Sequence, residues 1–471
     1  MQNAKQILTF YSQVFMISTK TASRKEIIGW AMFDFANQAY TTLIITVIFG
    51  VIFTRVIVGD GPDFKLGNLL WSLSLCISYA MVVLLAPVCG AIMDHSCAKK
   101  KFLFVSYVIT VISTACLYFI TPGMIYWGML LIIISNLAYS MGEGFIAAFL
   151  PGLGPPETLG KISGFGWALG YIGGLFSTGI VLLGLGGIEE SNFENLRLTG
   201  PLAATFFLLG AIPTFLWLRE KKNTAPPRSP SFYIQKGFSR IKSTLDQLPA
   251  FRDLAVFLLS LFFAMAGLYI IISFTFIYGD QVIGWDPKFQ MLMFVLTQVT
   301  AAGGAVLFGI LQDRLGAKIT FNLTLMLWIL SITLIYFTPD IARLLSSLLG
   351  IDVEPQQFFL VVGCLAGTGL GSVQSCARTM VGMFTPDNKW AEFFGFWGMT
   401  IKLAAIFGIL GLGILQSFVG LQAAVLLCLA FFVLALIINT FVNEKRGLAR
   451  ARSFIIPDTD QDLSLDRSKI S

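Results

Sequence analysis

The chain has 471 residues and a formal net charge of +6, with 56% hydrophobic residues and only 12% charged ones. An average soluble domain carries about 25% charged residues, so this composition excludes an ordinary soluble protein and indicates a membrane protein. The basic residues fall in short segments between apolar runs, which argues against a nucleic-acid-binding surface.

Twelve long apolar runs follow one another along the chain, and a helix needs about 20 such residues to cross a bilayer. The first six predicted helices lie near 27–57, 67–93, 102–121, 124–150, 160–186 and 198–218. The second six lie near 252–279, 288–311, 317–338, 356–384, 391–416 and 419–442. The sequence therefore predicts an all-α integral membrane protein of two six-helix halves, 27–218 and 252–442, joined by a polar central loop, 219–251.

Lysine and arginine are distributed unequally between the two sets of connecting segments. Segment 219–252 carries eight of them, and more gather in the N-terminal segment 1–26, at Lys99–Lys101 and in the tail 443–471. Because basic segments remain on the cytoplasmic side, both termini and the central loop are expected there. We expect an interfacial helix at 7–17 and a polar, mobile tail. A bacterial inner membrane is the simplest location.

The two predicted halves share a motif at the end of their second helix. Gly90 and Asp94 end the second helix, and Gly309 and Asp313 end the eighth, each followed by basic residues. The glycine would permit close packing, and the aspartate could accept hydrogen bonds from the N-terminus of the following helix or from a basic partner. The repeat predicts pseudo-symmetric halves. We interpret five residues as conformational gating residues: Gly90, Asp94, Gly309, Asp313 and Arg314.

Four ionisable residues lie inside predicted helices: Asp34, Glu143, Arg378 and Lys402. A charge in hydrocarbon costs several kcal/mol, so such residues usually face the bundle interior and mark a solute or ion path. Glu143 and Arg378 each precede a helix-ending proline by eight residues, which places them at similar depth. They could bind solute, or they could form a structural pair, and Asp34 could simply hold Arg378 in place.

Polar side chains accompany these charges on the same helix faces. Asn37, Gln38 and Thr41 follow Asp34 at helical spacing, and Gln374 lies one turn from Arg378. These faces are expected to line a cavity between the halves.

Five sequence blocks resemble one family, in the same order along the chain. They are Trp30–Tyr40 (WAMFDFANQAY), Ala148–Pro151, Gly164–Gly174, Gly371–Gln374 and Ala391–Phe396. The blocks resemble the branch of the major facilitator superfamily named for vacuolar, autophagy-associated amino-acid effluxers. The resemblance implies two halves that rock about a central site, and a monomer. The chain departs from the family at His95 and Cys97, where arginine and glycine are usual, and at Ala264–Gly267, where a polar pair is usual.

These features predict a secondary active transporter of a small polar solute, such as an amino acid or a similar carboxylate-bearing metabolite, that works by alternating access. Asp34 or Glu143 would couple a proton, because carboxylates in dry surroundings titrate closer to neutral pH; sodium is the alternative coupling ion. Arg378 and Lys402 would suit a solute carboxylate, which also fits siderophores and peptides. The rival from another class is a non-transporting membrane sensor with a transporter fold.

Catalytic patterns of soluble enzymes are missing from the sequence. It contains no P-loop motif, and its single histidine, His95, leaves no credible catalytic triad. The seven cysteines are scattered singly, which favours free thiols over disulfides or a metal site. We therefore expect no enzyme activity, cofactor or metal.

Overall fold

A computed structural model describes residues 21–59, 65–185, 192–220, 251–387 and 389–453. Within that part of the chain, twelve helical spans are long and apolar enough to cross a membrane, and they fall at the twelve predicted places. Expectations for segment 7–17, for most of the central loop and for the end of the tail lie outside the described residues.

The N-terminal half contains α2 (Arg24–Ala39), α3 (Phe49–Ile52), α4 (Lys65–Ser96), α5 (Lys99–Cys116), α6 (Ile125–Ala147), α7 (Pro156–Leu185), α8 (Phe193–Leu196), α9 (Thr199–Gly210) and α10 (Ile212–Trp217). The C-terminal half contains α12 (Arg252–Tyr278), α13 (Pro287–Leu315), α14 (Ala317–Tyr336), α15 (Thr338–Leu349), α16 (Pro355–Phe384), α17 (Trp390–Val419), α18 (Leu421–Ala424), α19 (Leu426–Thr440) and α20 (Glu444–Ser453).

The first span is built differently from the others. It begins at α2, where the side chain of Ser23 accepts a hydrogen bond from the N–H of Glu26 and so caps the helix. At Tyr40–Val47 the backbone becomes π-helical, and α3 continues the span. A π-helical turn changes the direction in which later side chains point, and such turns are frequent at functional sites. This one directly follows the polar residues of α2.

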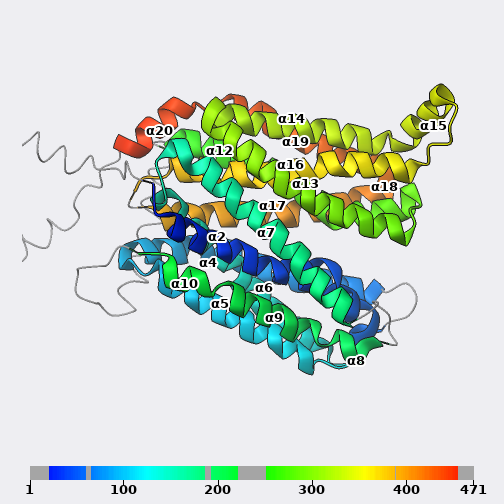
Figure 1. Cartoon of the computed structure of the whole chain (residues 1–471), viewed down its shortest axis with the longest axis horizontal. Coiled ribbons are helices and arrows are strands. Elements are labelled where there is room, and N and C mark those ends of the chain that lie inside the picture. Colours follow the sequence, from blue (N-terminus) through cyan, green and yellow to red (C-terminus); the bar gives the residue numbers. More distant parts are fainter. Residues whose placement is uncertain (1–20, 60–64, 186–191, 221–250, 388, 454–471) are drawn as a thin grey trace, which may run out of the picture.

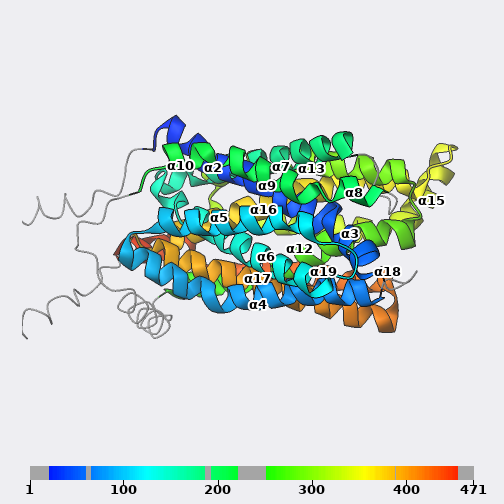
Figure 2. The same cartoon turned by 90° about the horizontal axis from the view of Figure 1, so that it is seen from below.

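The two halves lie side by side along the length of the bundle (Figure 1). Two helix pairs form most of the boundary between them: α4 of the first half packs against α17 of the second, and α7 packs against α13 (Figure 2). The start of α2 and the helix α20 lie at one end of the bundle, which we call the terminal face. The short helices α8 and α15 lie at the other end, the opposite face.

The two halves also make matching contacts at the terminal face. Glu444, after the last span, accepts hydrogen bonds from the backbone N–H groups of Ala317 and Lys318 at the start of α14 (3.0 and 2.9 Å). Glu220, after the sixth span, accepts one from Lys100 at the start of α5 (3.2 Å). A carboxylate at a helix N-terminus is favoured by the helix dipole. The repeat predicted from the sequence thus extends to helix capping.

The expectation of a mobile tail from residue 443 is wrong at its beginning, because Glu444–Ser453 forms the helix α20. Two carboxylates fix this helix to the bundle. Glu444 caps α14, and Asp253 at the start of α12 binds Arg446 (2.7 Å) and the N–H of Asn443 (2.8 Å). The burial of Gly447 and Ala451 completes the packing. Tertiary contacts therefore order a segment that its polar composition alone would predict to be a mobile tail.

Candidate transport site between the halves

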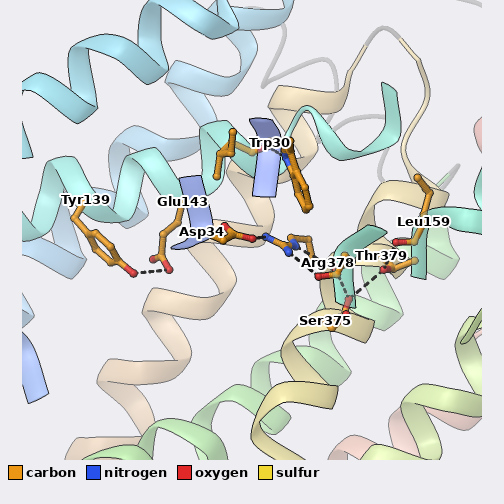
Figure 3. Close-up of polar contacts among 10 residues, drawn as sticks. Trp30, Asp34, Tyr139, Glu143, Leu159, Ser375, Arg378 and Thr379 are labelled. Carbon is orange, nitrogen blue, oxygen red and sulfur yellow. Dashed lines mark hydrogen bonds and ion pairs between the residues drawn. The ribbon is translucent and has the colours of Figure 1, made fainter. Parts of the chain in front are cut away.

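Asp34 and Arg378 form a buried ion pair that connects the two halves. Asp34 lies on α2 and Arg378 on α16, and the guanidinium Nη1 is 2.7 Å from Asp34 Oδ2 (Figure 3). Their side chains are only 12% and 3% exposed. Neutralisation by an opposite charge is the usual condition for burying either group. The sequence alternative in which Asp34 holds Arg378 in place therefore matches the geometry.

The rest of the Arg378 guanidinium is held by the N-terminal half as well. Its Nε donates to the hydroxyl of Ser163 (3.1 Å), and its Nη2 donates to the carbonyl oxygen of the same residue (3.0 Å). The rings of Trp30 and Trp167 lie 4.5 and 5.3 Å from the guanidinium carbon, within the range of cation–π attraction. Arg378 thus reaches from the C-terminal half into a binding site made by α2 and α7.

Glu143 and Lys402 form a second ion pair between the halves. Glu143 lies on α6 and Lys402 on α17, with 3.2 Å between the ammonium nitrogen and Glu143 Oε2. The lysine side chain is 7% exposed and the glutamate side chain 27% exposed. A pair between Glu143 and Arg378 was one alternative from the sequence, and the structure pairs each with a different residue. Lys402 is thus already paired with a carboxylate of the protein, whereas the sequence led us to expect that it binds the carboxylate of a solute.

Tyrosine side chains surround the second pair. The hydroxyl of Tyr139 donates to Glu143 Oε1 (3.0 Å; Figure 3) and accepts from the hydroxyl of Thr41 (2.6 Å). The Lys402 ammonium lies 3.4 Å from the Tyr269 hydroxyl and 5.1 Å from the centre of the Tyr79 ring. Sequence reasoning did not identify these tyrosines. Tyr139 could have been found, because it lies one helical turn from Glu143 on α6.

The other predicted site residues occupy nearby positions. Gln374 donates to the hydroxyl of Tyr171 on α7 (2.8 Å), so it also connects the halves. Gln38 is partly exposed and lies against Gly174 of α7, whereas Asn37 is buried, at 5% exposure. Asn37 is therefore almost fully enclosed, whereas Asp34 and Gln38 on the same helix are less buried.

The gating aspartates bind helix N-termini, but not those of the following helix. Asp313 accepts hydrogen bonds from the backbone N–H groups of Gly160 and Lys161, at the start of α7 in the other half (2.9 and 3.1 Å). Asp94 accepts one from Glu392 at the start of α17, again in the other half (2.8 Å), and pairs with Lys99 (3.4 Å). The expected basic partner is present for both aspartates, Lys99 for Asp94 and Lys161 for Asp313 (3.9 Å), whereas the helix N-termini that they bind belong to the other half.

The glycines of the same motif allow this approach between the halves. A Cβ at Gly90 would collide with the backbone carbonyl of Ala391, and one at Gly309 with that of Gly160. Arg314, the fifth predicted gating residue, is exposed at the end of α13. At the end of α6 and just after it, every residue from Phe145 to Leu150 is buried. The bundle is therefore tightly packed between the charged pairs and the terminal face.

Comparison with known proteins identifies the family. The model of the "Vacuole effluxer Atg22 like" family matches residues 70–452. The chain belongs to this family. A relative from Bacillus subtilis (strain 168), the uncharacterized MFS-type transporter YxiO, is 26% identical over 432 residues, which are 88% of this chain and 94% of that protein. The Autophagy-related protein 22-1 of Emericella nidulans is 23% identical over 262 residues, but these are 53% of this chain and only 43% of the fungal protein.

Solved structures agree on the fold of this Atg22-like protein. A bacterial homologue of the iron transporter ferroportin, in an outward-facing state, superimposes with a TM-score of 0.65 at 14% identity, covering 88% of this chain and 98% of the other. The proton:xylose symporter XylE gives a TM-score of 0.64 at 13% identity, covering 91% and 98%. At such low identity the likeness concerns the fold, which is that of the major facilitator superfamily. The Atg22-like chain is therefore a multi-pass membrane transporter of the major facilitator type.

The departure from the family pattern in the seventh helix has a structural explanation. Ala264, Met265 and Ala266 of α12 are at most 2% exposed, and Ala266 packs against Gly408 of α17. This stretch, where the sequence departs from the expected family pattern, is thus part of the packed core. One turn later, α12 supplies Tyr269 to the second ion pair.

Proposed function

We propose that this protein is a secondary active transporter that moves a small polar solute by alternating access, with the solute bound next to Asp34, Glu143, Arg378 and Lys402. The observation that carries the proposal is the pair of buried ion pairs, both of which join the N-terminal half to the C-terminal half. An immobile scaffold gains little from intramembrane charge, since well-packed apolar groups are often as stable as a buried pair. A transporter needs such groups to bind a polar solute away from water.

The charges suit a solute that carries a carboxylate, and an amino acid in particular. Arg378 and Lys402 would bind the carboxylate, and Glu143 is the more accessible acid for an amino group. The family name and the fungal relatives are consistent with an amino acid, while siderophores or peptides are the alternative solutes. We further propose proton coupling through Asp34 or Glu143, because the solute can compete with protons for the same carboxylates.

We also propose that the terminal face is cytoplasmic and that the membrane is a bacterial inner membrane. The basic residues support this orientation, because Lys99–Lys101 and α20 lie at the terminal end of the spans, and the basic segment 219–252 connects the sixth span to the seventh. In this orientation the contacts of Asp94 and Asp313 would close the cytoplasmic side. Both residues would then act as gating residues that release their helix N-termini when the cytoplasmic side opens.

Flux measurements in proteoliposomes test the proposal. The vesicles would contain a pool of amino acids and organic acids under an imposed pH gradient, with choline in place of sodium in a parallel series. We expect gradient-dependent flux that falls at least tenfold in Asp34→Asn. Glu194→Gln is the matched control, because Glu194 is an exposed acid whose partner, Arg197, lies far from the two central ion pairs, before α9.

Persistent flux in Asp34→Asn would remove Asp34 from the coupling role. Absence of flux for every solute in the pool, from folded protein, would lead first to carboxylate siderophores and peptides. If these also fail to move, the sensor alternative replaces transport.

A further inference from the structure

The ammonium group of Lys402 is bound by groups that would bind a free ammonium ion equally well. Its nitrogen lies 3.2 Å from a carboxylate oxygen of Glu143 and 3.4 Å from the hydroxyl of Tyr269. The ring centres of Tyr79 and Tyr269 lie 5.1 and 5.8 Å away. Cations are attracted to aromatic faces within about 6 Å, and the Tyr79 ring lies within that limit, whereas Tyr269 is nearest through its hydroxyl.

Most of this arrangement is built without Lys402. Glu143 is oriented by Tyr139, which is in turn oriented by Thr41, and all three belong to the N-terminal half, as does Tyr79. Lys402 enters from the C-terminal half on α17. A movement that separates the halves at this depth would withdraw the lysine and leave the carboxylate and one ring face in place.

We propose that Glu143, Tyr79 and Tyr269 form an ammonium-binding site, which Lys402 occupies in this state as a tethered cation. The site suits an ammonium better than a metal ion, because hard metal cations prefer a full shell of oxygen ligands and here one side is the ring face of Tyr79. The consequence for coupling rests on the proposed function: no dissolved sodium ion is needed at Glu143, since the protein supplies the cation itself.

The test removes the tethered cation and asks whether a free one replaces it. Purified full-length Lys402→Ala would be unfolded thermally in methylammonium chloride, and in sodium chloride at the same ionic strength. We expect methylammonium to raise Tm saturably, by about 2 °C or more once it exceeds its Kd tenfold, with sodium giving a smaller rise. The wild type, whose site is filled, and Glu143→Gln/Lys402→Ala, whose site lacks its carboxylate, should show no specific rise. Lys288→Ala is the matched control, because that lysine is exposed at the start of α13.

Three results would overturn the proposal: no methylammonium effect in Lys402→Ala, an equal effect in the wild type, or an equal effect of sodium. If Lys402→Ala is unstable on its own, methylammonium present during purification is expected to restore a monodisperse protein, and failure to do so also overturns it. Because the readout is binding, a protein that transports nothing could still show the site. The absence of flux would therefore refute the proposed function but would not bear on the binding of methylammonium to Lys402→Ala.

Discussion

Removing the Arg378 side chain is the sharpest test of the first ion pair. In Arg378→Ala the Asp34 side chain, which is 12% exposed in the intact pair, would lose its counter-charge, and Ser163 would lose two hydrogen bonds. Breaking a buried pair by removing one partner typically costs about 3–5 kcal/mol, because an uncompensated charge is left behind. The two hydrogen bonds to Ser163 have a charged donor, and such bonds contribute about 1.5–3 kcal/mol each, which places the expected loss at or above the upper end of that range.

The double variant Asp34→Asn/Arg378→Gln separates the charge effect from the packing effect. With both charges gone, no buried charge remains unpaired, so we expect the loss to shrink to about 1–2 kcal/mol. The double variant should therefore be more stable than Arg378→Ala, and a full double-mutant cycle should give a coupling energy of about 2 kcal/mol or more. The free energy of unfolding of the purified proteins in detergent is the measurement. Arg343→Ala is the control, because that arginine is 77% exposed in its pair with Asp340.

Additive losses of unfolding free energy in the single variants would contradict this expectation. If Arg378→Ala costs no more than Arg343→Ala, or if the losses of the two single variants simply add, the pair holds no coupling energy. The structure would then join the halves by packing, and the charges would serve another purpose.

Two changes at the terminal face should weaken closure there, and labelling of Cys376, buried on α16, in a variant without the other cysteines can measure both. Gly309→Ala places a methyl group against the Gly160 carbonyl and should raise the labelling rate severalfold. Gly303→Ala, with nothing within 4 Å of its new Cβ, should not change it. Asp313→Asn removes the charge that accepts two N–H groups of α7, a loss of about 1–2 kcal/mol, so labelling should accelerate about tenfold. An unchanged rate in both would mean that these contacts do not keep the face closed.

The helices could be predicted closely because the bilayer imposes a single requirement on every span. Each needs about 20 apolar residues with internally satisfied backbone groups, and that requirement is local in sequence. The segment that forms α20 was wrongly predicted to be mobile, because its order depends on contacts that are not local in sequence. Its order depends on Asp253 and Glu444, whose partners lie far away in sequence or on another helix.

The candidate site was predictable in its members and not in its pairings. Intramembrane charges stand out in any sequence, so Asp34, Glu143, Arg378 and Lys402 were evident. Which acid meets which base depends on how the two halves face one another, and the partners are 344 and 259 residues apart. Local spacing placed Glu143 and Arg378 at one depth, but depth alone does not bring two side chains into contact.

The distribution of the four central charges suggests why the protein closes as it does. Both acids belong to the N-terminal half and both bases to the C-terminal half, so the two halves attract one another at the depth of the site. At the terminal face the arrangement is symmetric instead, with one aspartate of each half bound to a helix N-terminus of the other. A state in which the halves separate at the site would expose two unpaired acids and two unpaired bases, at a cost of several kcal/mol for each charge that stays dry. In the proposed function, a solute with one ammonium and one carboxylate could replace the two partners of one broken pair, which would make the loaded protein easier to open than the empty one.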